Sequence, residues 1–206
     1  MKNSIKTLTL LLVAILFSNV SYGVVYKLNN TSWTNSANSS TTAPVQSSLG
    51  SGDTVVISGN GTWTLTRAVT SNVRLSGGTL AQSTNTLTGR VMVKGANSTI
   101  TGTGSINGAL RVYDNTLTFG SNKTITSLSM DGGNVNLSAY VVTSTSDFNL
   151  NSSGTISGTA GSGIFYTGTN NETNINAGIL TIDNAEFIGD KLDFASNGNI
   201  KTVNSG

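Results

Sequence analysis

Few side chains in this chain of 206 residues have the types and spacing that catalysis needs, and two carboxylates come first. Asp114 and Asp131 follow successive strand-like segments at nearly matching turn positions, and Arg111 lies close to Asp114. Glycosidases use a pair of carboxylates, whereas polysaccharide lyases need acidic calcium ligands and a basic residue, a role open to Arg111 or Lys123. An Asp at a turn also caps backbone N–H groups, and we favour this structural role for both residues.

Composition excludes most other catalytic chemistry. The chain has no histidine and no cysteine. Disulfides, thiolate or imidazole metal sites, and Ser-His-Asp or Cys-His catalysis are therefore ruled out. We expect no cofactor, no metal site and no enzymatic activity.

Regular threonines form a candidate binding face. Several triplets read polar–apolar–polar, so the outer two residues of each face away from a core. The face consists of Thr64, Thr66, Thr99, Thr101, Thr116 and Thr118. Such an array is similar to the ice-binding face of some β-solenoid antifreeze proteins, although Thr is also favoured on any exposed strand. The aromatic residues Trp63, Tyr113 and Phe165 are expected near the surface, where they could stack on sugars.

The elements that position these residues follow from a repeat. Eight segments carry two apolar residues at i and i+2, with 16 to 20 residues between copies and a Gly, Asn or Asp turn after each. This first column holds Val55/Ile57, Val73/Leu75, Val91/Val93, Leu110/Val112, Leu128/Met130, Phe148/Leu150, Ile164/Tyr166 and Leu180/Ile182. A second column holds Leu65, Leu80, Ile100, Leu117, Val135, Ile156 and Ile175. A third column holds Val69, Leu87, Ile106, Ile125, Val142, Ala160 and Ala177.

Three apolar columns with one period predict an all-β, single-domain parallel β-solenoid. Each coil of roughly 18 residues contributes three strands, and about eight coils stack into a rod over residues 53–206. A β-sandwich or a meander of hairpins is the alternative, but neither requires a common coil length.

The opening coils resemble a known group. The segments Gly52–Ile57, Gly61–Leu65 and Asn72–Gly77 are similar to the first coils of pectin-lyase-like right-handed parallel β-helices. The later Gly/Thr/Asn-rich coils resemble the passengers of autotransporter and haemagglutinin-type adhesins. The resemblance covers roughly residues 50–190 and implies a right-handed helix, but it carries no motif that defines an activity.

Two segments precede the repeat. Residues 1–23 have a basic start, an apolar run too short for a permanent membrane anchor, and small residues before the cut, all typical of a secretory signal peptide. Residues 24–52 are predicted to be either an N-terminal cap over the first coil or a linker.

Charge is balanced overall but divided along the predicted rod. Lys2 and Lys6 leave with the signal peptide, so nine of the 11 basic residues remain beside nine acidic ones, and we expect no nucleic-acid partner. Residues 67–123 carry six basic groups and one acid, whereas residues 124–206 carry two basic groups and seven acids. This division favours end-to-end self-association, or binding of a surface polysaccharide to the basic half.

These observations predict a secreted, non-enzymatic structural or adhesive β-solenoid of a bacterial cell surface or extracellular matrix. The alternatives are a carbohydrate-active β-helix enzyme, either a polysaccharide lyase or a hydrolase, and an ice- or glycan-binding module.

Overall fold

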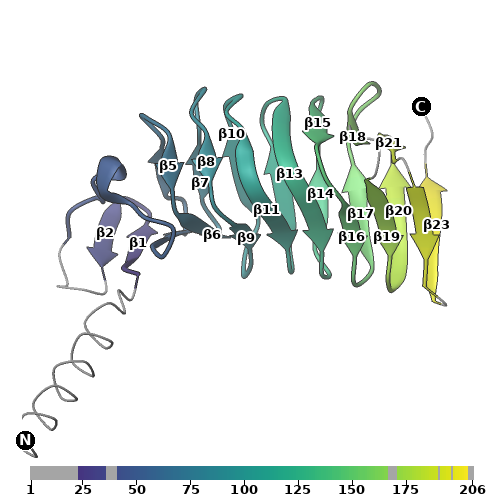
Figure 1. The fold of residues 1–206 in the computed structure, drawn as a ribbon, viewed down its shortest axis with the longest axis horizontal. Coiled ribbons are helices and arrows are strands. Elements are labelled where there is room, and N and C mark those ends of the chain that lie inside the picture. The colour runs from purple at the N-terminus through teal and green to yellow at the C-terminus, as the bar shows by residue number, and fades with distance from the viewer. Residues whose placement is uncertain (1–22, 36–40, 167–170, 190, 196, 204–206) are drawn as a thin grey trace, which may run out of the picture.

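The predicted parallel β-solenoid is confirmed. In the computed structural model, the described residues are 23–35, 41–166, 171–189, 191–195 and 197–203. They form an elongated rod of about seven turns, and a 3-10 turn, η1 (Gln46–Ser48), is their one helical element (Figure 1). The described residues contain no helix long and apolar enough to cross a membrane. Residues 1–22, nearly the whole of the predicted signal peptide, lie outside the described residues.

Face 1 of the solenoid corresponds to the first predicted column. Its strands pair in parallel, each with the equivalent strand of the next coil. They are β3 (Thr54–Ser58), β6 (Asn72–Ser76), β9 (Val91–Val93), the second part of β11 (Ile106–Val112), the second part of β13 (Lys123–Met130), β16 (Phe148–Leu150), β19 (Glu172–Ile175) and β22 (Lys191–Phe194).

Face 2 is a separate eight-stranded parallel sheet. Its strands are β4 (Thr62–Thr64), β7 (Thr79–Ala81), β10 (Ser98–Thr101), β12 (Thr116–Phe119), β14 (Asn134–Asn136), β17 (Gly154–Ser157), β20 (Gly178–Asp183) and β23 (Gly198–Val203).

Face 3 completes each coil with shorter strands. It contains β5 (Val69–Thr70), β8 (Leu87–Thr88), the first parts of β11 and β13, β15 (Val141–Ser144), β18 (Gly163–Tyr166) and β21 (Glu186–Ile188). Because β11 and β13 bend around the corner from face 3 to face 1, these two faces belong to one 15-stranded sheet.

The core is a continuous stack of aliphatic side chains inside the three faces. Alternation along each strand sends every second side chain inward, and these side chains are buried through the middle coils, as Val93, Ile106 and Leu128 show at 0% exposure. Burial of each such side chain is worth about 1.5–3 kcal/mol relative to exposure, so the stack supplies the main stabilisation of the rod.

Sharp corners allow each coil to change direction. Gly77, Gly95 and Gly132 follow β6, β9 and β13 with φ angles of 106°, 102° and 130°, and Asn115 follows β11 with a φ of 59°. Positive φ is easiest for Gly and tolerated by Asn, so the turn residues in the repeat reflect the geometry of this corner.

The predicted columns are wrong in the last coils. Phe148 pairs with Thr173, 25 residues later, and not with Ile164, which pairs with Val142 on face 3. This coil is therefore longer than the preceding ones, whereas the prediction assumed a short step to the next apolar pair. Leu180 and Ile182 accordingly lie on face 2 and Ile175 on face 1, while Ala160 of the third column is exposed and Ala177 is half-buried. The side chains of Phe165 and Tyr166 lie outside the described ones.

The second column contains two slips of two residues. Leu80 pairs with Trp63 and not with Leu65, and Ile100 pairs with Phe119 and not with Leu117. A shift of two preserves the inward direction of a side chain, so all these residues are buried even though their neighbours differ. Trp63 was expected near the surface, but it is 4% exposed and belongs to the core.

Additional strands cover the N-terminal end. Strand β1 (Val25–Asn29) pairs in parallel with β3, and β2 (Ser32–Asn35) pairs antiparallel with β1. Leu28 is buried at 2% exposure and Trp33 packs against the core. The Gln46 amide donates to the Thr64 carbonyl at 2.7 Å and accepts from the Thr66 N–H at 2.9 Å, so a side chain occupies the edge beyond β4.

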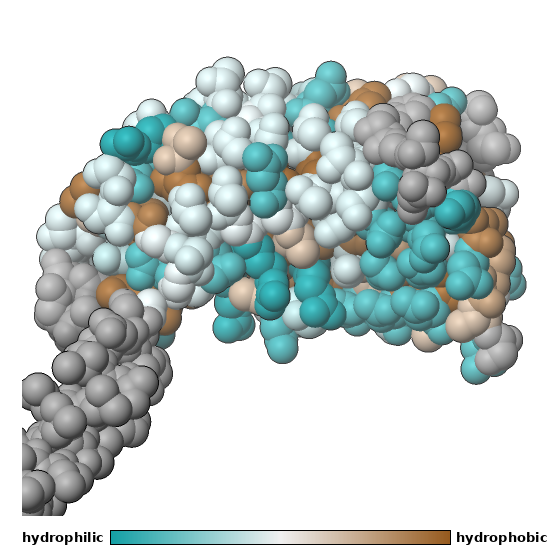
Figure 2. Space-filling view, in the orientation of Figure 1, coloured by the Kyte–Doolittle hydropathy of each residue, from teal (hydrophilic) through white to brown (hydrophobic). Residues whose placement is uncertain are grey.

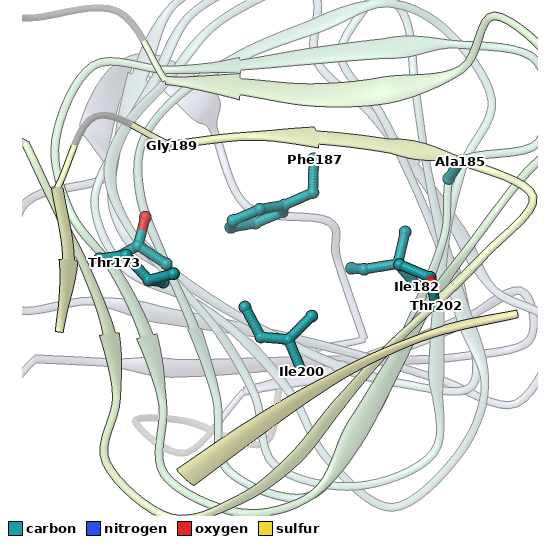
Figure 3. A pocket seen from close by; sticks show the side chains of 8 residues that line it. Thr173, Ile182, Ala185, Phe187, Gly189, Ile200 and Thr202 are labelled. Carbon is teal, nitrogen blue, oxygen red and sulfur yellow. The ribbon is translucent and has the colours of Figure 1, made fainter. Parts of the chain in front are cut away.

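The C-terminal end of the described rod is open. A pocket of about 330 Å³ lies there, and its lining comes from all three faces: Thr173, Phe187, Ile182 and Ile200 point into it (Figure 3). Leu192 and Phe194 are exposed by 55% and 46%, and apolar surface gathers at this end of the rod (Figure 2).

Candidate functional site

The outward surface of face 1 brings most of the predicted chemical residues together. Strand register and side-chain alternation give each coil three outward positions on this face. From β6 to β22 they are Asn72, Arg74, Ser76; Arg90, Met92, Lys94; Ala109, Arg111, Tyr113; Ser127, Ser129, Asp131; Asp147, Asn149, Asn151; Glu172, Asn174, Asn176; and Lys191, Asp193, Ala195.

The charge division along the chain is therefore a division of one face. Its first three coils carry four cations and no carboxylate at these positions, and we call this part the basic half of face 1. The next four coils carry four carboxylates and one cation, and we call them the acidic half.

Arg111 and Asp131 meet where the two halves join. The Arg111 Nη2 lies 2.8 Å from Asp131 Oδ2, and its Nε donates to the same oxygen at 3.0 Å. The Asp131 side chain is only 13% exposed, so water screens this ion pair less than one at an open surface. The bond joins neighbouring coils and occupies the carboxylate oxygen that faces Arg111.

Asp114 lies at the corner after Tyr113 and has a different set of partners. Its Oδ1 accepts from the Gly95 N–H of the preceding coil at 2.6 Å and from Asn115 Nδ2 at 3.0 Å. These bonds hold the pKa of Asp114 below its usual value, with a smaller contribution from the charges of Lys94 and Arg74. A carboxylate that remains ionised in this way is a poor general acid, because it has no proton to donate near neutral pH.

Amide side chains continue the contacts of Asp131 along the acidic half. Asp131 Oδ1 accepts from Asn151 Nδ2 at 2.7 Å, and Asn151 Oδ1 accepts from Asn176 Nδ2 at 2.9 Å. Together with Arg111, these side chains form a ladder that crosses four coils. The bonds run parallel to the rod axis and add to the backbone bonds between the same strands.

Tyr113 connects cations of two coils on the basic half. Lys94 Nζ lies 5.5 Å and Arg111 Cζ 4.9 Å from the centre of the Tyr113 ring. Both distances are within the range of cation–π attraction. The ring therefore restricts two of the four cations on this part of the surface.

The threonine face has a different pattern from the one predicted. One unbroken ladder crosses four coils of face 2 and consists of Thr62, Thr79, Thr99 and Thr118. Thr64 and Thr101 belong to a second row that Ala81 interrupts. Thr116 pairs with Asn134, and Thr66 lies beyond β4 against Gln46. The threonines thus form one row with fragments beside it, rather than a flat double array.

Lys123, considered for a basic role in a lyase, lies inside the solenoid. It is 2% exposed, and its Nζ donates to Gln82 Oε1 at 2.8 Å, to the Gly104 carbonyl at 3.0 Å and to the Gly102 carbonyl. Burial lowers the pKa of Lys123 to about 8. The ammonium group is enclosed by neutral oxygens and faces away from Arg111 and the carboxylates of face 1.

Sequence analysis did not identify this buried polar cluster, although the alternation contained the signal. Lys123 lies two residues before Ile125, and Gln82 lies two residues after Leu80, so both share the inward direction of core residues. Both side chains are polar, so a pattern of apolar residues does not reveal them.

Comparisons with known proteins provide no relative: no family model, curated protein or solved structure matches the chain.

Proposed function

We propose that this protein is a secreted, non-enzymatic β-solenoid that acts as a structural and adhesive element of a cell surface or extracellular matrix. One observation carries the proposal: the side chains best suited to catalysis are bound to neighbouring coils. Asp114 holds the backbone of the coil before it, and Asp131 holds Arg111 on one side and Asn151 on the other. Such bonds stabilise the contacts between adjacent coils. Both carboxylates therefore have a structural role.

The proposal includes a right-handed path and a relation to the adhesin passengers that the coils resemble. Right-handed crossovers are strongly preferred between parallel strands of one sheet. Fold alone does not determine activity, so the exposed charged face, rather than the architecture, supports adhesion.

Substitution of both carboxylates tests the non-enzymatic part. We expect no depolymerisation of pectin, alginate or other polyuronides by the wild type, and unchanged surface attachment in Asp114→Asn and Asp131→Asn. Asp131→Asn should lower the free energy of unfolding by roughly 1 kcal/mol through loss of the ion pair. Depolymerisation that either variant abolishes would contradict the proposal and favour the lyase or hydrolase alternative. Fractionation of producing cells tests the location, with protein confined to the cytoplasm as the contrary result.

The outer edge of β22, the last described strand of face 1, favours association with a second copy through this edge. No described strand pairs with the outer edge of β22, on which Leu192 is exposed, whereas β1 and β2 cover face 1 at the other end. Two copies related by a twofold axis would pair their β22 strands antiparallel. With Leu192 opposite Leu192, Lys191 of each copy lies opposite Asp193 of the other. A shift by two residues would place Asp193 against Asp193, so charge selects this register.

Charge reversal tests this pairing. Lys191→Asp and Asp193→Lys should each weaken the dimer about tenfold in sedimentation equilibrium, because like charges then face each other. The double variant should restore the dimer, since opposite charges face again. Lys27→Asp, which reverses an exposed cation on β1, is the control and should have no effect. A double variant as weak as the single ones, or open filaments in the wild type, would contradict the twofold arrangement.

A further inference from the structure

Four cations surround one methionine on the basic half of face 1. Arg74 and Arg111 pair with Met92 on the coils before and after it, and Arg90 and Lys94 lie directly before and after its strand, β9. Neighbouring strands are about 4.8 Å apart, and alternate residues along a strand are about 6.6 Å apart. The four Cα positions therefore mark a diamond about 10 Å along the rod and about 13 Å across it. We call these five residues the basic cluster.

The cations of the basic cluster differ in how far they are neutralised. Arg111 is paired with Asp131, and the Asp114 carboxylate is close enough to Lys94 and Arg74 for their charges to affect its pKa. Arg74, Arg90 and Lys94 are exposed, and none of the three forms an ion pair with another described residue. The described carboxylates therefore neutralise the cluster only in part, and it retains a net positive charge.

The surroundings of the basic cluster favour a chain-like ligand over a small anion. The cations project from a flat strand surface, so a single small anion would remain largely hydrated there. A polymer with several anionic groups can contact three or four cations at once, and each contact after the first is intramolecular. Tyr113 holds Lys94 and Arg111 in place, so less side-chain freedom is lost on binding.

The acidic half of the face determines how such a polymer lies. A polyanion that followed the rod axis toward the C-terminal end would soon meet Asp131, Asp147 and Glu172 and be repelled. A polymer that crossed the rod along β9 would contact the basic cluster and meet one carboxylate, that of Asp114 at the corner after Lys94.

We propose that the basic cluster binds a linear anionic polysaccharide, with carboxylate or sulfate groups, that crosses face 1 along β9. Guanidinium groups bind planar oxyanions through paired hydrogen bonds. A nucleic acid is less favoured, because its affinity depends on many phosphate contacts and the acidic half limits these to a few. The inference rests on the adhesive function proposed above and specifies the class of its ligand.

Binding of defined polymers tests the proposal. Polygalacturonate supplies carboxylates, dextran sulfate supplies sulfates, neutral dextran is the uncharged control and duplex DNA represents the other polyanion class. We expect at least one of the two anionic glycans to bind more tightly than dextran and DNA, and the stronger of the two identifies the anionic group. Equal binding of dextran, or tighter binding of DNA than of both glycans, would overturn the proposal.

Matched variants locate the site. Arg74→Gln/Arg90→Gln should weaken glycan binding about tenfold or more, since two of the four charged contacts are lost. Arg67→Gln/Lys201→Gln removes the same charge away from face 1 and should change binding less than about twofold. Met92→Glu places a carboxylate at the centre and should abolish binding, with thermal unfolding to confirm that the variant is folded. Equal losses in the first two variants would contradict the site. If these variants bind less glycan but attach to cells normally, the basic cluster is a glycan site, and its proposed part in adhesion is contradicted.

Discussion

The terminal coils of a solenoid have strand edges without a neighbouring coil, and the two ends of the described rod differ in whether these edges are covered. At the N-terminal end, β1 extends face 1 by one strand, β2 turns back against it, and the Gln46 side chain bonds to the backbone beyond β4. At the C-terminal end, β22 and β23 have no described strand on their outer side, and the inward residues of the last coil are half exposed.

This difference shows that an inward direction does not by itself bury a side chain. Val93 and Leu192 both point toward the axis of the solenoid, but Val93 has coils above and below it and is 0% exposed, whereas Leu192 is 55% exposed. Stability in a repeat protein depends on contacts with both neighbouring repeats, so the terminal coil should contribute least. Four predictions test this difference.

The largest effect is expected from a charge placed in the middle of the stack. Val93→Asp buries a carboxylate without a partner and should lower the free energy of unfolding by about 4 kcal/mol or more. Leu192→Asp makes a similar change at the open end and should cost less than about 1 kcal/mol, because water still reaches the side chain. Urea denaturation followed by circular dichroism measures both. Similar losses at the two sites would mean that the last coil is covered in solution.

A smaller effect is expected from the pH dependence of the buried cation. The unfolded chain holds the Lys123 proton up to its usual pKa of 10.5, whereas the folded protein releases it near pH 8. Between these values the unfolded state binds more protons, so stability should rise with pH, by on the order of 3 kcal/mol in total. Below pH 8 the cost of the buried charge is fully present.

Methionine variants separate this effect from other titrations. The pH-dependent rise should disappear in Lys123→Met and persist in Lys191→Met, which removes an exposed lysine at the open end. Thermal unfolding between pH 7 and pH 10.5 provides the measurement. An unchanged rise in Lys123→Met would mean that this lysine is not enclosed.

The apolar contacts of the two ends provide a third comparison. Leu28→Ala removes a buried side chain beneath the cap and should cost about 2–3 kcal/mol. Phe194→Ala at the open end should cost less than about 1 kcal/mol despite the larger side chain, since 46% of it is already exposed. Denaturant midpoints of the two variants test the order, and a larger loss in Phe194→Ala would reverse it.

The smallest effect is expected at the edge of β4. Gln46→Ala removes two hydrogen bonds to the backbone and should cost about 1 kcal/mol. Gln46→Glu retains an acceptor for the Thr66 N–H but loses the donor to the Thr64 carbonyl, so its loss should be intermediate. Hydrogen exchange of the Thr66 amide reports on the edge directly, and unchanged protection in Gln46→Ala would exclude this capping role.

The fold could be predicted because a solenoid repeats its own signal. Val55, Val73 and Val91 recur at one interval with turn residues after each, and the structure pairs them in that register. The prediction failed where the interval changed: the coil between Phe148 and Thr173 is longer, and Thr173 is an inward polar residue that an apolar pattern does not detect. The spacing of apolar residues does not reveal the length of this coil. The pairing of Phe148 with Thr173 joins two strands that are distant in the sequence.

The arrangement of face 1 was accessible only in part. The charge division was visible along the chain, and Asp114 and Arg111 could be placed near one corner. The pairing of Arg111 with Asp131 depends on which residues face each other on adjacent coils, and a slip of two residues would have separated them. The role of Met92 between four cations required the register of three strands at once.

The bonds between coils also have a mechanical consequence. They run along the rod axis, so a pull along that axis loads the interfaces between coils in series, and the weakest interface yields first. Among the described coils, yielding would begin at the C-terminal one, which has a described neighbour on one side only. Each released coil of about 18 residues replaces about 4.8 Å of rod with about 60 Å of extended chain. A tether built in this way lengthens under load and dissipates the energy of a tug, while the remaining coils keep their structure.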